Sequence, residues 1–317
     1  MHQIMPTNAM EAEESNARVS KVKASWSKKA GTIAKRAIKL GIALCFYCGS
    51  RLRRGLQIML GREPAGTCVV LYYHAVPAHL RGRFAKQMDV LTRCATPIRA
   101  DHQEALAPGR HHVVITFHDA FVSVKDNAVP ELMKRKIPST IFVPTGYLGQ
   151  HPGWIKDETH SDFGETVLDA NGLKSLDREY VLLESHTVHH PSLPKLDESE
   201  AREELVKSKV ELESILERSV DLLAFPYGDY NDKIVDWSKQ AGYQRVFAIQ
   251  PNVAFSNPKE FVTGSCSVSP GDWNLEFKMK LMGAYSWLVP LMKFVRRTGR
   301  ARGRELLPVE QSRQENI

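Results

Sequence analysis

The sequence lacks the cysteine pattern of a disulfide-stabilised domain or of a structural zinc module. Its five cysteines are an odd set, and they do not fall into the paired knuckle spacing of a zinc ribbon. Cys45 and Cys48 form a lone CxxC pair, a spacing that is most often incidental. We therefore expect neither a disulfide framework nor a structural zinc site built from cysteine.

A long apolar run and an N-terminal secretory signal are also missing. The apolar run at residues 37–48 is interrupted by Lys39 and is shorter than the ~20 residues that span a bilayer. Residues 1–20 are polar and acidic instead of basic and then apolar. Basic residues flank the apolar run, so residues 26–60 are predicted to form an amphipathic helix, either as a peripheral contact on an anionic membrane surface or packed on the flank of the domain. The sequence leaves the location open between the cell envelope, the extracellular space and the cytoplasmic face of a membrane.

Beyond its N-terminal segment the chain lacks net charge. Residues 1–65 hold 12 Lys/Arg against 4 Asp/Glu, whereas the remainder holds 31 against 32. A neutral body does not suit nucleic acid, and no nucleic-acid partner is expected. With 317 residues and 43% hydrophobic composition, the chain can bury one catalytic-sized core. We expect a basic arm over residues 1–65 that is disordered up to about residue 25, a folded domain over residues 66–290, and a frayed polar tail over residues 291–317.

Short apolar runs alternate with helical patterns in the expected domain. Strands are predicted at residues 68–73, 112–117, 139–143, 180–183, 222–225 and 245–249, and helices at 124–135, 198–218 and 233–241. Asp197 and Glu200 suit a capping box at the start of the second helix. The alternation predicts an α/β fold with a mostly parallel sheet and helices outside it. The polar stretch at residues 151–175 is longer than an ordinary connection and is expected to form a lip over a site.

Two histidines four positions apart follow one of the predicted strands. They are His186 and His190, and Asp119 follows another predicted strand. Pro191 disfavours a helix at the preceding residue, so the histidine pair fits a loop at a strand end. Two imidazoles and one carboxylate are a ligand set for a divalent metal that leaves a coordination position for water. Taken alone, the histidine pair could also be a His-rich surface loop.

Three segments around these residues resemble signature motifs of the polysaccharide deacetylases, the carbohydrate esterases with NodB homology. The segments are residues 116–120 (TFHDA), 185–191 (SHTVHHP) and 224–228 (AFPYG), in the family's order and spacing. Residues 71–74 and 137–143 resemble two of the family's strands, so that the likeness covers about residues 67–285. The resemblance implies a distorted (β/α) barrel and a hydrolase that removes acetyl groups from N-acetylated sugars of a polysaccharide or oligosaccharide.

The resemblance also implies roles for individual residues. Asp119, His186 and His190 would hold a divalent metal, usually zinc, that activates water for attack on the acetyl carbonyl. The backbone N–H of Tyr227 would stabilise the resulting oxyanion. The expected contacts to the sugar are Phe225, Pro226 and Trp154.

The chain departs from the family at the general base and the general acid. His118 stands where the family has the first of two adjacent aspartates. An imidazole can accept a proton near neutral pH, but His118 could also be a fourth metal ligand or face away from the site, because successive strand residues point to opposite sides. The usual late Leu-x-His is missing. His189 is either a replacement acid or a solvent-facing loop residue. His74 is expected in the core, with a position near the site as the alternative. A catalytically degenerate barrel that binds or assembles glycans is therefore the alternative to a hydrolase.

Overall fold

The computed structural model describes residues 7–290 apart from 253, 256 and 258, with the backbone alone for residues 7–30. The predicted tail at 291–317 and the first six residues of the predicted arm lie outside the described residues. The chain divides into a unit that ends at Ile42 and a larger unit that begins at Ala43. All strands described below belong to the larger unit.

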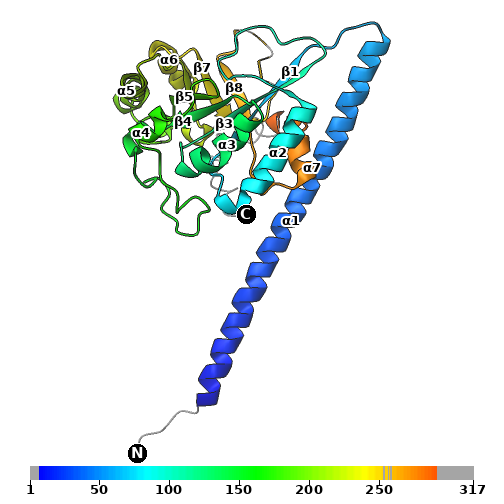
Figure 1. Cartoon of the computed structure of the whole chain (residues 1–317). Coiled ribbons are helices and arrows are strands. Elements are labelled where there is room, and N and C mark those ends of the chain that lie inside the picture. Colours follow the sequence, from blue (N-terminus) through cyan, green and yellow to red (C-terminus); the bar gives the residue numbers. More distant parts are fainter. Residues whose placement is uncertain (1–6, 253, 256, 258, 291–317) are drawn as a thin grey trace, which may run out of the picture. The chain divides into compact units, whose positions relative to one another are not determined.

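Seven parallel strands close into a barrel with helices outside it (Figure 1). In ring order the strands are β1 (Thr67–Tyr73), β3 (His111–Phe117), β4 (Ser139–Val143), β5 (Val181–Ser185), β6 (Leu222–Ala224), β7 (Arg245–Ile249) and β8 (Val262–Ser267). The ring closes because β1 pairs with both β3 and β8. The two-residue β2 (Thr96–Pro97) pairs with β3 outside the ring. The predicted distorted (β/α) barrel is thus confirmed.

All six predicted strands form, and β8 is the barrel strand that the sequence prediction missed. Its sequence, Val-Thr-Gly-Ser-Cys-Ser, is small and polar and lacks the apolar run used to find the others. It is nevertheless buried over most of its length, because the neighbouring strands β1 and β7 pair with it on both sides. Ring closure, and not the hydrophobicity of its own residues, therefore defines this strand.

Six helices accompany the barrel. They are α2 (Arg81–Cys94), α3 (Val129–Lys134), α4 (Ala170–Lys174), α5 (Glu198–Leu216), α6 (Asp232–Gln240) and α7 (Asn274–Leu281). Helix α5 begins with the predicted capping box: Glu200 N donates to the Asp197 carboxylate at 2.9 Å, and Asp197 N donates to the Glu200 carboxylate at 3.2 Å. The predicted helix at 124–135 is divided into a π-turn over Val124–Ala128 and α3, because Pro130 lacks an N–H and is tolerated only in a first helical turn.

Helix α1 spans Thr7–Met59 and contains the predicted amphipathic segment. The prediction of disorder up to about residue 25 differs from the structure, in which the helix extends back to Thr7. Residues 7–25 are rich in Ala, Glu and Lys, which are strong helix formers. Their helix propensity accounts for the difference between the prediction and the structure. Within the described part of the chain, no helix combines the length and the apolar character that crossing a bilayer requires.

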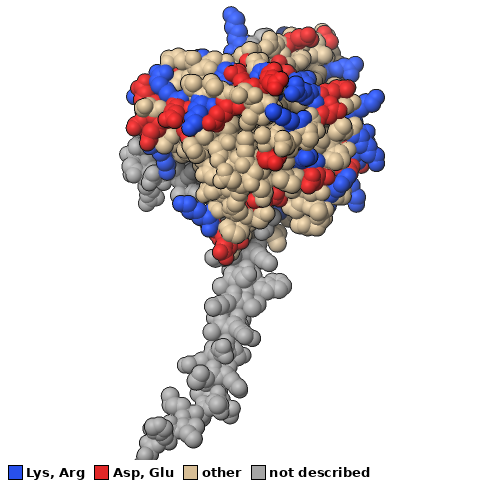
Figure 2. Space-filling view, turned by 60° about the vertical axis from the view of Figure 1, so that its left-hand side comes forward, with Lys and Arg blue, Asp and Glu red and all other residues tan. Residues whose placement is uncertain are grey.

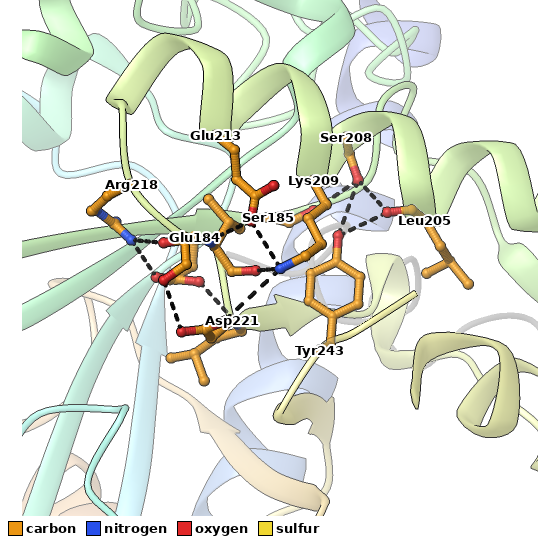
Figure 3. A network of polar contacts seen from close by, with 12 residues as sticks. Glu184, Ser185, Leu205, Ser208, Lys209, Glu213, Arg218, Asp221 and Tyr243 are labelled. Atoms are coloured by element: carbon orange, nitrogen blue, oxygen red, sulfur yellow. Dashed lines mark hydrogen bonds and ion pairs between the residues drawn. The ribbon is translucent and has the colours of Figure 1, made fainter. Parts of the chain in front are cut away.

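The seam between β5 and β6 distorts the barrel next to the ends of these strands. Only Ser185 and Leu223 are paired across it. The Glu184 carboxylate bridges the gap by accepting hydrogen bonds from Leu222 N at 2.7 Å and from Arg218 Nη1 at 3.0 Å, part of the network in Figure 3. Burial raises the pKa of the Glu184 carboxyl to about 7. Side chains thus take over a connection that backbone groups make elsewhere in the barrel.

Helix α5 is fixed to the outer side of the same seam. Ser185 Oγ donates to Ser208 Oγ at 2.9 Å, and Tyr243 OH donates to Leu205 O at 2.9 Å (Figure 3). All of these groups are buried. Because buried polar groups are costly unless they are paired, this set favours one position of α5 against β5.

Candidate metal centre

Asp119, His186 and His190 converge where β3 and β5 end. Asp119 Oδ1 lies 3.5 Å from His186 Nε2 and 3.5 Å from His190 Nε2. One ligand atom of each residue lies within 4.8 Å of the other two, and all three residues are buried. Ligand atoms placed ~2.0–2.1 Å from a tetrahedral ion are separated by roughly 3.4 Å. The spacing therefore fits a single divalent ion.

The orientation of His186 also suits metal binding. Its Nδ1 lies 2.8 Å from Ala224 O, and because a carbonyl oxygen only accepts, Nδ1 carries the proton. The lone pair of Nε2 then faces Asp119. In many metal sites a histidine binds the metal through one ring nitrogen in this way and donates the N–H of the other to a backbone carbonyl. Burial, with His186 and His74 nearby, lowers the pKa of His190 well below its usual value. Its imidazole is therefore neutral near pH 7, the form that binds a metal.

Unusual backbone angles are concentrated at this centre. Of the eight non-glycine residues with positive φ in the described part of the chain, five lie here. They are Asp119, Ala120, Thr187, His190 and Tyr227. The turn at Asp119 (φ 71°) and Ala120 (φ 51°) breaks the alternation of β3, so that the consecutive residues His118 and Asp119 both approach His186. Such angles favour glycine, and in other residues they persist where surrounding packing enforces them.

His118 is buried beside the three candidate ligands. Its ring stacks on Tyr72 with centroids 4.6 Å apart, meets Phe142 edge-on at 5.6 Å, and lies 4.9 Å from the ring of His186. Burial, together with the neighbouring histidines, lowers the pKa of His118 well below its usual value. Its Nε2 makes no hydrogen bond to any described residue. His118 is not part of the three-residue ligand group found among the described residues.

Tyr72 was not identified as a site residue from the sequence, and for His74 a core position was preferred to one near the site. His74 Nε2 lies 4.0 Å from Asp119 Oδ2, and its half-buried ring lies 5.6 Å from that of His118, so the expectation of a core histidine differs from the structure. The alternation of β1 offered a signal, because Val70, Tyr72 and His74 share one side of the strand. Val70 belongs to the core cluster inside the barrel, and the next two residues on that side reach the site.

The predicted lip contributes Trp154, which lies over a candidate ligand. The Trp154 ring stacks on His190 with centroids 4.4 Å apart and planes 21° apart, and it meets Tyr147 edge-on at 5.0 Å. The Tyr227 ring lies 4.7 Å from His190 at a steep angle. The side chain of His190 is therefore held by two aromatic neighbours.

Phe225 and Pro226 lie beneath the surface. Both are buried, and Phe225 stacks on Tyr230 with centroids 5.4 Å apart. The turn they form needs Gly228, which has φ +62° and whose position would place an added Cβ 2.5 Å from Ile249 Cβ. The two residues thus form and support the turn, and a sugar would meet Phe225 only after a rearrangement.

Residues 106–246 match the family model described as polysaccharide deacetylase. This part of the barrel domain is therefore of the polysaccharide deacetylase type. The Bacillus subtilis (strain 168) protein YxkH, whose name includes polysaccharide deacetylase, is 24% identical over 164 residues, which cover 52% of this chain and 54% of the relative. The poly-beta-1,6-N-acetyl-D-glucosamine N-deacetylase of Staphylococcus aureus (strain MSSA476) is 29% identical over 164 residues, which cover 48% of this chain and 52% of the relative. The chain thus spans about half the length of these relatives.

Solved structures share the fold of the deacetylase domain. IcaB from Ammonifex degensii superposes with a TM-score of 0.57 at 23% identity, covering 70% of this chain and 98% of that one. The Streptococcus pyogenes deacetylase PplD superposes with a TM-score of 0.56 at 18% identity, covering 69% of this chain and 99% of PplD. At these identities the likeness concerns the fold alone.

Within the deacetylase domain, Glu204 is a further residue that the sequence reasoning missed. Its Oε2 accepts hydrogen bonds from Val188 N and His189 N, both at 2.9 Å, and its Oε1 lies 2.6 Å from His189 Nδ1. Glu204 projects from the buried face of α5, next to Leu205. A carboxylate beside the apolar stripe of a helix was the available signal, because a buried charge requires partners.

Glu204 therefore ties the loop between the two candidate histidine ligands to helix α5. The loop is also closed on itself, since His190 N donates to Thr187 Oγ1 at 3.1 Å. His189, the candidate replacement acid, contacts Glu204 through Nδ1 while 58% of its side chain is exposed. Its Nδ1 is thus engaged in holding the loop.

Proposed function

We propose that the chain is a metal-dependent hydrolase that removes acetyl groups from the N-acetylated sugars of a polysaccharide. The observation that carries the proposal is the 3.5 Å separation of Asp119 Oδ1 from both His186 Nε2 and His190 Nε2. Two imidazole nitrogens and a carboxylate oxygen form a donor set that suits zinc. Bound there, such an ion would polarise the acetyl carbonyl and make water a competent nucleophile near neutral pH.

We assign to His118 the acceptance of a proton from the attacking water. Two observations support this role: the pKa of His118 is lowered, so its imidazole is neutral at pH 7, and its Nε2 has no hydrogen-bond partner among the described residues. The proton held on His118 can then pass to the amine as the C–N bond breaks, so that one side chain serves as base and acid. This assignment accounts for the missing Leu-x-His acid.

Of the remaining candidate residues, we assign substrate contacts to Tyr227 and Trp154. We assign the oxyanion to the backbone N–H of Tyr227, supported by the tight turn with φ 58° that places this residue beside His190. Trp154 offers an aromatic ring to a sugar. Phe225 and Pro226, predicted as sugar contacts, keep the turn in place. The Staphylococcus aureus relative is named for deacetylation of poly-beta-1,6-N-acetyl-D-glucosamine, which makes this polymer the first substrate to test, at the cell envelope.

A second candidate function is favoured by the surroundings of His118. Its ring is enclosed by Tyr72, Phe142 and His186, and no carboxylate occupies the position of the family's base. A barrel that keeps its metal and sugar contacts but lacks an effective base would bind or assemble glycans without hydrolysing them.

Acetate release from N-acetylglucosamine oligomers by the purified full chain distinguishes the two functions. The informative variants are His190→Ala, which removes a ligand, and His118→Asp, which introduces a carboxylate base. His79→Ala is the matched control, because His79 is exposed and lies outside the centre. If the parent and His79→Ala release acetate and His190→Ala does not, the result supports hydrolysis. If the parent contains metal but releases no acetate, and His118→Asp gains acetate release, the barrel is degenerate and the first proposal is overturned.

A further inference from the structure

Exposed apolar side chains are concentrated on α1 and its end. Of the thirteen large hydrophobic residues that are exposed in the described part of the chain, nine lie between residues 33 and 60. Leu52 is 77% exposed and Met59 is 84% exposed. The other four are spread over three helices: Met133, Val206, Val210 and Leu275. Isolated exposed apolar residues are normal, whereas a concentration of this kind marks a contact surface.

Part of this surface forms one stripe along α1. We define the apolar stripe as Ile38, Ile42, Phe46, Leu52 and Leu56. At 100° per residue these side chains fall within a sector of roughly 120°, one face of the helix. The opposite face carries the buried Ala43 and the half-buried Tyr47, so the apolar stripe is not the face that packs within the larger unit.

From residue 26 to the end of α1, the charge along the helix is of one sign. Residues 26–62 hold nine Lys/Arg and no Asp/Glu. Lys35 and Arg53 are exposed, and helical geometry places both on the face of the apolar stripe, at an angle between those of Ile42 and Phe46. The barrel differs, since Figure 2 shows Lys/Arg and Asp/Glu interspersed over its visible face. The positive charge and the exposed apolar surface therefore coincide on α1.

We propose that the apolar stripe of α1 docks the protein on an anionic phospholipid surface. The apolar side chains enter the boundary between headgroups and acyl chains, while lysine and arginine stems lie along them and bring their charges to the phosphates. The helix lies on the membrane without crossing it. A second copy of residues 26–62 does not suit this face, because nine cations would meet nine cations with no carboxylate among them. The proposal is independent of the catalytic activity.

The test is sedimentation of the full chain with vesicles of phosphatidylcholine, with and without phosphatidylglycerol. Binding is expected only to the vesicles with phosphatidylglycerol, and it should weaken as salt is added. Each cation near such a surface contributes about a fivefold gain in affinity. Replacing two of them, Lys35→Glu with Arg53→Glu, is thus expected to reduce affinity at least ~25-fold. Leu52→Ser with Leu56→Ser is expected to reduce it at least ~tenfold.

Two control pairs distinguish the effect of the apolar stripe from the effects of net charge and of exposed apolar groups elsewhere in the protein. Lys174→Glu with Lys233→Glu changes the net charge equally at exposed positions of the barrel, and Val206→Ser with Val210→Ser removes exposed apolar groups from α5. Both pairs should bind vesicles like the parent. Equal loss in these controls, equal binding to both kinds of vesicle, or unchanged binding of the α1 variants would overturn the proposal. A dimer in light scattering that dissociates in the leucine variant, with no lipid affinity, would assign the apolar stripe to a second copy and also overturn it.

Discussion

Removal of the Glu204 carboxylate tests whether the loop between the candidate ligands His186 and His190 is held from outside the candidate metal centre. Glu204→Ala deletes the acceptor of two backbone N–H groups and the partner of His189 Nδ1. Hydrogen bonds to a charged group contribute ~1.5–3 kcal/mol each, and an unsatisfied buried donor costs ~1–3 kcal/mol. Because the three bonds share one carboxylate, their effects do not simply add. We expect the free energy of unfolding to fall by about 3–5 kcal/mol.

The more specific effect is on metal affinity. Val188 and His189 lie between His186 and His190, so a loosened loop spreads the positions of the ligand nitrogens. Loss of groups that orient ligands typically weakens metal binding ~10–100-fold. Competition with a chelating dye measures the affinity for zinc, and the absorption spectrum of the cobalt form reports the ligand geometry. Glu204→Gln, which keeps an acceptor for the backbone groups, should lie between the parent and Glu204→Ala.

Glu213→Ala is the matched control on the same helix. The Glu213 carboxylate accepts from Val220 N at 3.0 Å and pairs with Lys209 at 3.0 Å, within the network of Figure 3. This variant should lose stability and keep the metal affinity of the parent. A folded Glu204→Ala protein that binds zinc as tightly as the parent would refute the positioning argument. Absence of zinc binding by the parent would refute the metal centre itself, which is a different result.

Three further predictions concern packing, substrate and pH. Gly228→Ala should lower the free energy of unfolding by about 2–4 kcal/mol, since its Cβ would collide with Ile249 at a positive φ; an unchanged urea midpoint would contradict this. Trp154→Ala should raise KM for N-acetylglucosamine oligomers about three- to tenfold through lost stacking, and steady-state kinetics with an unchanged KM would argue against a sugar contact. Burial lowers the pKa of His111, so its stabilising effect is complete above the unfolded value of about 6.5 and is lost as the pH falls below it. His111→Gln should flatten the decline in unfolding free energy from about pH 7 to about pH 5, and an equally steep decline in the variant would exclude this origin.

Several features of the fold could be predicted from local sequence because they depend on local chemistry. The alternating apolar runs located six strands, and Asp197 with Glu200 located the start of α5. These signals lie in neighbouring residues, whose side chains interact with their own backbone or share one face of an element. The polar β8 escaped prediction because its burial comes from β1 and β7, which are distant in sequence. The helical backbone of α1 likewise extends further than its polar composition suggested.

The candidate site divides in the same way. The spacing of His186 and His190, together with Asp119, indicated a metal-binding set. Residues 116–120, 185–191 and 224–228 indicated the family. Both could be predicted because they depend on residue types and on their spacing in the sequence. Only the tertiary structure brought His74 beside Asp119, buried His118 against Tyr72, and tied the ligand loop to Glu204. Those contacts depend on parallel strands ending at the same rim of a closed ring and on a helix packed across one seam. Distances of that kind follow from how the whole chain closes, and no local stretch of sequence contains them.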